Sequence, residues 1–160
     1  MYPLDGEPCH YSIIQLWRVI QVLPGGMVAN LHQSVHGAAH HKAVIIVDDN
    51  AVVRRIIGNA FLEDGFASYV EAENGAEGVE VVKQTRPDLA ILDLSMPVMN
   101  GLQTAFVLRS LFPQMPIILF SLYGDATIKA EAARAGIDAV ISKTDDIPVL
   151  IDKAHELLHL

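Results

Sequence analysis

Acidic side chains follow two apolar segments that have the length and composition of buried strands. Asp93 comes directly after Leu89–Leu92, and the pair Asp48 and Asp49 comes directly after residues 44–47. Parallel strands deliver their carboxyl ends to one edge of a sheet, so these acids would lie close together. Their mutual repulsion makes such a cluster costly unless a cation lies between them. The pattern therefore predicts a Mg²⁺ site at which a phosphoryl group is transferred onto Asp93.

Length and composition favour one compact domain. The chain has 160 residues, of which 51% are apolar and 19% charged, and its net charge of −8 argues against a nucleic-acid partner. Cys9 is the only cysteine, which excludes an internal disulfide and favours a reducing, cytoplasmic compartment. No apolar stretch is long enough to cross a membrane, and the start of the chain lacks the basic region of a secretory signal, so no membrane is expected.

From residue 43 onward, short apolar runs alternate with longer amphipathic segments. The predicted strands are residues 43–47, 67–72, 88–93, 116–120 and 139–142. The helices between them are expected to begin at residue types that cap helices, namely Asn50, Asn74, Asn100 or Gly101, Asp125, and Asp145 or Asp146. This alternation predicts an α/β fold with a doubly wound parallel sheet covered by helices on both faces.

The first predicted helix, residues 51–63, has a clear amphipathic pattern. We expect its apolar side chains to face the core and its charged side chains to face solvent. The expected core positions are Val52, Ile56, Phe61 and Leu62, and the expected solvent positions are Arg54, Arg55 and Glu63.

Residues 1–42 differ in character and are predicted to form an N-terminal extension, helical in part or disordered. Residues 11–23 are apolar with polar interruptions, and we expect them to pack on the domain or on a second copy in a homodimer. Residues 29–42 are a histidine-rich linker. His36 and His40 have a spacing that binds a transition metal on a helix, but the small residues between them favour a linker without a metal.

Four groups of residues in the second part resemble the receiver domain of bacterial two-component response regulators. They are Val47-Asp48-Asp49, the segment from Asp93 to Gly101, Ser121, and Ile141-Ser142-Lys143, in the order and at the separations of that family. The resemblance covers residues 43 to about 158. It implies a flavodoxin-like (βα)5 sandwich of three layers with strand order 2-1-3-4-5. Because the chain ends after the fifth helix, we expect a stand-alone receiver, residues 43–160, without an output domain.

The resemblance also implies a role for each site residue. Asp93 would accept the phosphoryl group from the phosphohistidine of a sensor histidine kinase or a phosphotransfer protein. Mg²⁺ would be held by Asp48, Asp49, Asp93 and the backbone carbonyl of Ser95. Lys143 would contact a phosphoryl oxygen, and the hydroxyl of Ser121 would donate to it and couple phosphorylation to a partner-binding surface around the fourth helix. Such a protein catalyses only its own phosphorylation and dephosphorylation and is not otherwise an enzyme.

Two positions depart from the family pattern. Val140 stands where the family usually has a tyrosine or phenylalanine that switches between exposed and buried positions, and Tyr123 is the nearest aromatic alternative. Leu122 stands where a small residue usually gives access to the acceptor, so we expect it to slow entry or loss of the phosphoryl group.

Two other functions remain open on the sequence alone. Val140 and Leu122 are compatible with an interaction module that keeps the fold but signals without phosphorylation. A haloacid-dehalogenase-like phosphatase also uses an aspartate at a strand end, but that class has a second acid two residues later, where this chain has Ser95. It therefore ranks last.

Overall fold

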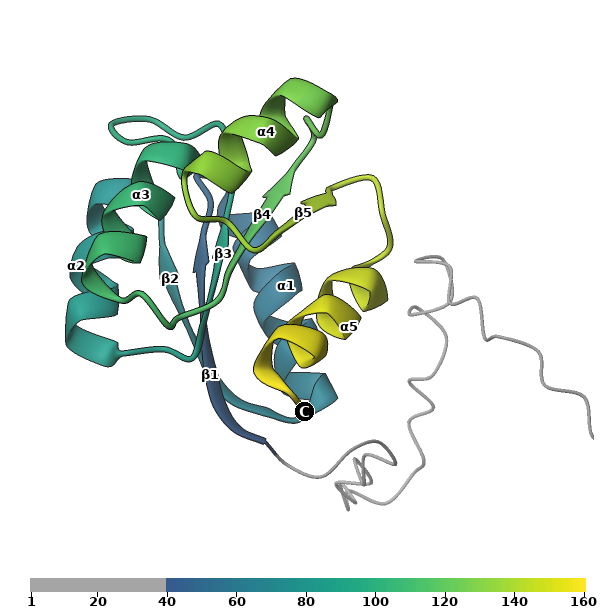
Figure 1. Cartoon of the computed structure of the whole chain (residues 1–160). Coiled ribbons are helices and arrows are strands. Elements are labelled where there is room, and N and C mark those ends of the chain that lie inside the picture. Colours follow the sequence, from purple (N-terminus) through teal and green to yellow (C-terminus); the bar gives the residue numbers. More distant parts are fainter. Residues whose placement is uncertain (1–39) are drawn as a thin grey trace, which may run out of the picture. The chain divides into compact units, whose positions relative to one another are not determined.

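The computed structural model describes residues 40–160 (Figure 1). Five strands and five helices alternate along this part of the chain: β1 (His40–Val47), α1 (Ala51–Asp64), β2 (Phe66–Ala72), α2 (Gly75–Thr85), β3 (Leu89–Leu92), α3 (Gly101–Leu111), β4 (Ile117–Ser121), α4 (Ala126–Arg134), β5 (Ala139–Ser142) and α5 (Ile147–Leu158). The predictions for Cys9, residues 11–23 and His36 lie outside the described residues. Among the described helices, none is long and apolar enough to cross a membrane.

The five strands form one parallel sheet in the order β2-β1-β3-β4-β5. This confirms the predicted fold class and strand order. The first strand begins at His40, three residues before its predicted start, because His40 pairs with Phe66 and Ala43 pairs with Ser68 on β2. Lys42, at the start of this strand, also forms an ion pair with Asp88 at 3.0 Å.

Helices cover both faces of the sheet, with α1 and α5 on one face and α2, α3 and α4 on the other (Figure 1). The central strands β3 and β4 are buried along their whole length. Two apolar cores result. In one core, Ile57 and Phe61 of α1 and Leu150 of α5 pack against one face of the sheet. In the other, Val79 of α2 and Leu108 of α3 pack against the opposite face. Burial of both faces explains why β3 and β4 have continuous apolar sequences rather than alternating patterns.

Side chains at the predicted caps hold four of the helix starts. Asn50, Asn74, Asn100 and Asp125 each accept a hydrogen bond from a backbone N–H in the first turn of the helix that follows. Such a bond satisfies a donor that the helix itself leaves unpaired. Asp146 occupies the cap position of α5 but makes no side-chain capping bond, and the Asp145 carboxylate accepts from the backbone N–H of Ser142 instead.

The core-facing side of α1 was predicted correctly at Phe61 but wrongly at Val52, Ile56 and Leu62. Val52 and Ile56 are 66% and 53% exposed, whereas the neighbouring Ile57 and Phe61 are fully buried. The helix carries two adjacent apolar stripes, one with Val52 and Ile56 and the other with Ile57 and Phe61. The packing of Gly58 determines which of the two faces the sheet. A Cβ at Gly58 would lie 2.4 Å from the ring of Tyr69 on β2, so this face of the helix approaches the sheet.

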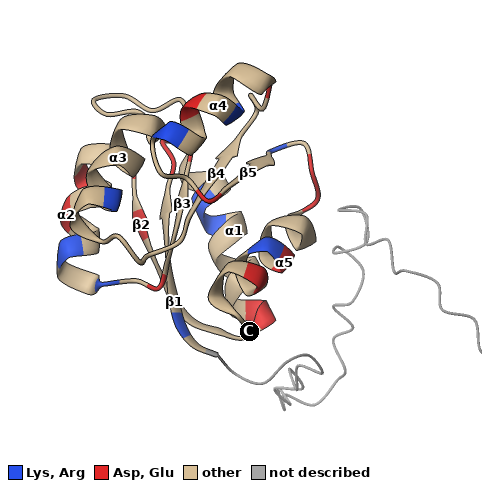
Figure 2. Cartoon of the chain, viewed as in Figure 1, with Lys and Arg blue, Asp and Glu red and all other residues tan. Residues whose placement is uncertain are grey.

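Acidic and basic residues are spread over the helices of the described part (Figure 2), and several of them form ion pairs within one helix. Arg109 on α3 instead contacts segments outside its own helix. Its guanidinium donates to the carbonyl oxygens of Gly136 at 2.7 Å and Pro113 at 2.6 Å, and to the Asp138 carboxylate at 2.6 Å. It thereby ties the end of α3 to the loop before β4 and to the loop between α4 and β5.

We expect Arg109→Lys to lower the free energy of unfolding by about 2 kcal/mol. Lysine keeps the charge but has no planar fork, so most of these carbonyl acceptors lose their partner. Urea denaturation monitored by circular dichroism measures the change. Arg134→Lys, at an exposed position on α4, is the matched control and should leave the stability unchanged; equal stability of both variants would show that the Arg109 contacts contribute little.

Candidate functional site

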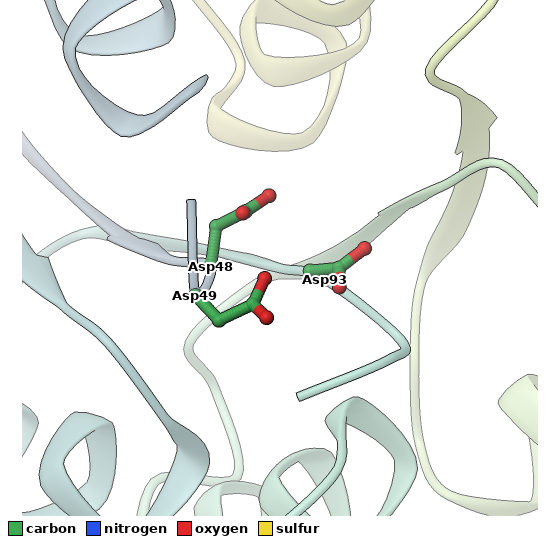
Figure 3. A group of neighbouring side chains, drawn as sticks. All are labelled: Asp48, Asp49 and Asp93. Carbon is green, nitrogen blue, oxygen red and sulfur yellow. The ribbon is translucent and has the colours of Figure 1, made fainter. Parts of the chain in front are cut away.

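The predicted acids meet where β1 and β3, which are neighbours in the sheet, both end. Carboxylate oxygens of Asp48, Asp49 and Asp93 all lie within 4.8 Å of one another. Figure 3 shows Asp48 and Asp49 at successive positions after β1, with Asp93 beside them after β3. Asp48 and Asp93 are buried, being only 2% and 7% exposed, whereas Asp49 is exposed. The cluster is therefore a pair of buried acids with one acid open to solvent.

Asp93 is held by bonds from three directions. Its backbone N–H donates to the carbonyl oxygen of Val47 at 2.8 Å, which fixes it beside β1. One carboxylate oxygen contacts the ammonium of Lys143 at 2.8 Å, and the other accepts the backbone N–H of Ser95 at 3.0 Å. Its carbonyl lies against the start of α3, where a Cβ at Gly101 would come within 2.3 Å of that oxygen. Only glycine fits this contact.

Lys143 is the cation of the site. Its ammonium lies 2.6 Å from Asp48 Oδ2 and 2.8 Å from Asp93 Oδ1, so it bridges the two buried acids. It comes from the loop after β5, and its backbone N–H donates to the carbonyl oxygen of Ser121 at 2.9 Å. The structure thus joins the ends of β1, β3, β4 and β5 around one cluster.

Burial and pairing shift the pKa values of two of these groups. Burial raises the pKa of the Asp93 carboxyl, and the neighbouring Asp48 charge adds to this effect, while the hydrogen bond and charge of Lys143 and the N–H of Ser95 oppose it. Burial alone would lower the pKa of Lys143. Its hydrogen bonds to Asp48 and Asp93, and their charges, outweigh that effect and raise its pKa above the ordinary value.

Ser121 is buried at the end of β4, and its hydroxyl oxygen accepts the backbone N–H of Tyr123 at 3.1 Å. The two residues that follow it, Leu122 and Tyr123, are 64% and 60% exposed. Val140, on the neighbouring strand β5, is half-buried and packs against the core beneath α4. The hydroxyl is therefore engaged with its own loop, and the aromatic side chain at position 123 points into solvent.

Arg54 also contacts the site, although the sequence pattern did not indicate it. Arg54 was expected to face solvent, yet its side chain is only 13% exposed. Its guanidinium donates to the carbonyl oxygen of Asp48 at 2.7 Å and pairs with Glu71 on β2 at 2.7 Å. The available signal was its spacing: Arg54 lies in the first turns of the helix that begins just after Asp48 and Asp49.

The donor set fits a hard divalent cation such as Mg²⁺. Carboxylate oxygens are the ligands that this ion prefers, and the exposed position of Asp49 leaves room for the water molecules that it retains. A thiolate or imidazole group, which would favour a softer metal, is absent from the cluster of acids that the described residues form.

Comparison with known proteins identifies the family to which this fold and this acid cluster belong. The sequence profile described as the response regulator receiver domain matches residues 44–155. The chemotaxis protein CheY of Halobacterium salinarum is 32% identical over 117 residues, covering 73% of this chain and 97% of that protein. A putative transcriptional regulator of Pseudomonas aeruginosa is 33% identical over 72% of this chain, and the match spans only 56% of that longer protein.

A solved structure with the same fold is that of the response regulator protein TrrA from Thermotoga maritima, in complex with Mg²⁺ and BeF. It is 28% identical, with a TM-score of 0.66, and the match covers 72% of this chain and 98% of that one. The sheet order, the acid cluster and the profile match over most of the described residues agree. This chain belongs to the response regulator receiver domain family.

Proposed function

We propose that Asp93 accepts a phosphoryl group from the phosphohistidine of a sensor histidine kinase or a phosphotransfer protein, in a reaction that requires Mg²⁺. The observation that carries this proposal is the Asp93 carboxylate, which is buried beside the ammonium of Lys143 at 2.8 Å and within 4.8 Å of the oxygens of Asp48 and Asp49. Asp49 is the solvent-exposed ligand for Mg²⁺, and Asp48, Asp93 and the carbonyl of Ser95 would be the other ligands that the protein supplies.

In phosphoryl transfer, the protein mainly positions the reacting groups and neutralises negative charge. An oxygen of Asp93 forms a bond to phosphorus while the bond between phosphorus and the imidazole nitrogen breaks, and the nitrogen leaves with the electron pair. Lys143 is placed to neutralise negative charge on the phosphoryl oxygens, and a bound Mg²⁺ would supply further neutralisation. Later attack of water at phosphorus releases inorganic phosphate and restores the carboxylate. The protein acts as an enzyme only on itself.

The phosphorylated protein would present a changed surface to a downstream protein. Ser121 is the coupling residue in this proposal. Its hydroxyl would donate to a phosphoryl oxygen, and the loop before α4 would move with it because the same hydroxyl oxygen accepts the Tyr123 N–H. A half-buried valine at position 140 has no ring to move, so the loop after Ser121, with its exposed Leu122 and Tyr123, would carry the change. Cytoplasmic location and homodimer formation are parts of the same proposal.

Incubation with acetyl phosphate and Mg²⁺, followed by intact-protein mass spectrometry, tests the proposed function. The proposal requires one phosphoryl adduct per chain, which does not form when the metal is chelated beforehand. Lack of any adduct with acetyl phosphate and with a panel of phosphorylated kinases would refute it.

We expect Leu122→Ala to accelerate both labelling of Asp93 by acetyl phosphate and loss of the phosphoryl group, each several-fold. Leu122 directly follows buried Ser121 and projects an exposed isobutyl group beside the edge that carries Asp93. A methyl group there admits the donor and the hydrolytic water more easily. The rates are read by quenched time courses and phosphate gels. Tyr123→Ala serves as the matched control, and rates equal to those of the wild type would refute a gating role for Leu122.

A second candidate is an interaction module that signals without phosphorylation, and the exposed pair Leu122 and Tyr123 together with Val140 favours it. In that case a downstream protein would bind equally well with and without beryllofluoride, a mimic of the phosphoryl group. The phosphoacceptor proposal instead requires binding that depends on beryllofluoride and Mg²⁺.

A further inference from the structure

The exposed acid Asp49 is the one member of the cluster whose direction no side-chain contact fixes. Asp48 binds Lys143 and the N–H of Asn50, and Asp93 binds Lys143 and the N–H of Ser95. Among residues 40–160, by contrast, no donor reaches the Asp49 carboxylate. The backbone must therefore aim this side chain at the place where a metal ion would bind.

The backbone on both sides of Asp49 is pinned. The carbonyl oxygen of Asp48 accepts the Arg54 guanidinium at 2.7 Å. Because a peptide group is planar, holding this oxygen also holds the N–H of Asp49. On the other side, the N–H of Asn50 donates to Asp48 Oδ1 at 2.8 Å. The peptide groups on both sides of Asp49 are thus held in place, and Arg54 holds the one between Asp48 and Asp49.

Arg54 is itself held from the neighbouring strand. Its Nε donates to the Glu71 carboxylate at 2.7 Å, and the Arg54 side chain is only 13% exposed. Glu71 pairs in register with Ile46 of β1, two residues before Asp48. The guanidinium therefore links α1, β1 and β2 at the level of the acid cluster. This is the geometry for which a planar group with several fixed donors is suited and a lysine ammonium is not.

We infer that Arg54 is a positioning residue for metal binding: by fixing the Asp48–Asp49 peptide group against Glu71, it holds the Asp49 carboxylate in the direction that a divalent cation requires. The inference rests on the proposed function, since it assumes that the acid cluster binds Mg²⁺. It assigns no contact between Arg54 and the ion or the phosphoryl group. Groups that orient metal ligands in this way commonly change metal affinity by about 10- to 100-fold when they are replaced.

The test is the dissociation constant for Mg²⁺, measured by isothermal titration calorimetry on the whole chain of wild type and variants. Arg54→Lys keeps the charge and loses the fork, and it should weaken Mg²⁺ binding by about tenfold. Arg55→Lys is the matched control, because Arg55 is the exposed neighbour on the same helix. It should bind Mg²⁺ as the wild type does. The Mg²⁺ concentration that gives half-maximal labelling by acetyl phosphate should rise by the same factor in Arg54→Lys and stay at the wild-type value in Arg55→Lys.

A second pair of variants keeps the test decisive if Arg54→Lys fails to fold. Glu71→Gln removes the charge that anchors the guanidinium, and Glu73→Gln removes the same charge from an exposed position just after β2. Mg²⁺ binding should weaken more in Glu71→Gln than in Glu73→Gln. In two-dimensional amide NMR spectra, the Asp49 and Asn50 signals should shift with Mg²⁺ in the wild type and at higher Mg²⁺ concentration in the variants.

The outcomes separate this inference from the proposed function. Mg²⁺ affinities of Arg54→Lys and Arg55→Lys that agree within about twofold, in folded proteins, overturn the positioning role while leaving the site intact. Equal weakening in both members of a pair also overturns it. Failure of the wild type to bind Mg²⁺ removes the proposed function, and the inference with it. Mg²⁺ binding without any phosphoryl transfer would refute the proposed function alone.

Discussion

Asp93→Asn should abolish Mg²⁺-dependent labelling by acetyl phosphate and at the same time make the protein more stable. The amide has no carboxylate oxygen to attack phosphorus, so the adduct is lost completely. The stability follows from the environment: burial raises the pKa of the Asp93 carboxyl, which means that the folded protein disfavours the ionised form. A neutral amide of the same shape avoids that cost, so we expect the free energy of unfolding at neutral pH without Mg²⁺ to rise.

The pH dependence of this gain has a definite sign. A carboxyl whose pKa is raised by folding contributes stability that is complete below its unfolded pKa and is lost as the pH rises through the folded value. The ordinary pKa of an aspartate is 3.8. The difference in free energy of unfolding between Asp93→Asn and the wild type should therefore be small in the acid range and should increase toward neutral pH. Urea denaturation at a series of pH values measures it. A gap that narrows as the pH rises would contradict the assigned cause.

Asp125→Asn is the matched control for both readouts. This aspartate is exposed and caps α4, and asparagine caps a helix equally well. The control should label as the wild type does and have the same free energy of unfolding at neutral pH. Labelling that persists in Asp93→Asn at the wild-type rate would move the acceptor to another residue.

Lys143→Met should slow phosphoryl transfer and tighten Mg²⁺ binding. The ammonium now lies 2.6 Å from Asp48 and 2.8 Å from Asp93 and so competes for the oxygens that a cation would use. Its removal frees those oxygens for Mg²⁺. It also removes a charge from the phosphoryl oxygens during transfer, and loss of one such stabilising group commonly costs about 10²- to 10³-fold in rate. Calorimetry with Mg²⁺ and stopped time courses with acetyl phosphate measure the two effects separately.

The same variant should be less stable than the wild type when Mg²⁺ is absent. A lysine whose pKa is raised by folding stabilises the protein below its unfolded pKa, and that stability is lost only as the pH rises through the raised value. At neutral pH the wild type therefore has the full contribution and Lys143→Met has none, since two buried acids face each other without a counter-charge. Mg²⁺ should restore the stability of the variant more than it stabilises the wild type.

Lys129→Met, at an exposed position on α4, controls for the change in net charge and should affect neither property. If Lys143→Met labels at the wild-type rate, Lys143 has no part in the transfer. If Lys143→Met binds Mg²⁺ more weakly than the wild type, the Lys143 ammonium does not compete with the metal ion for the carboxylate oxygens.

The parts of the fold that depend on local chemistry could be predicted from the sequence. Asn50, Asn74, Asn100 and Asp125 cap the helices because a short polar side chain satisfies the N–H groups of the next turn, whatever lies elsewhere. The acids after two apolar runs could be placed together because parallel strands end at one edge of the sheet. The strand order, in contrast, came from the resemblance to a family and not from periodicity.

The errors arise where packing between distant segments decides. Ile56 and Ile57 are adjacent in α1, and the sequence of the helix cannot show that Tyr69 of β2 lies over Gly58 and that Ile57 rather than Ile56 therefore joins Phe61 in the core. Arg54 was placed in solvent for the same reason, since its partner Glu71 lies on another element. The early start of β1 depends on its pairing with β2, which the polar residues at its beginning do not indicate.

The most direct test of this account is a crystal structure of the protein grown with Mg²⁺ and beryllofluoride. We expect a metal ion held by Asp48, Asp49, Asp93 and the carbonyl of Ser95, beryllofluoride attached to Asp93, and the ammonium of Lys143 moved onto the fluoride. Carboxylates that remain as in Figure 3, with neither the ion among them nor the mimic on Asp93, would contradict it.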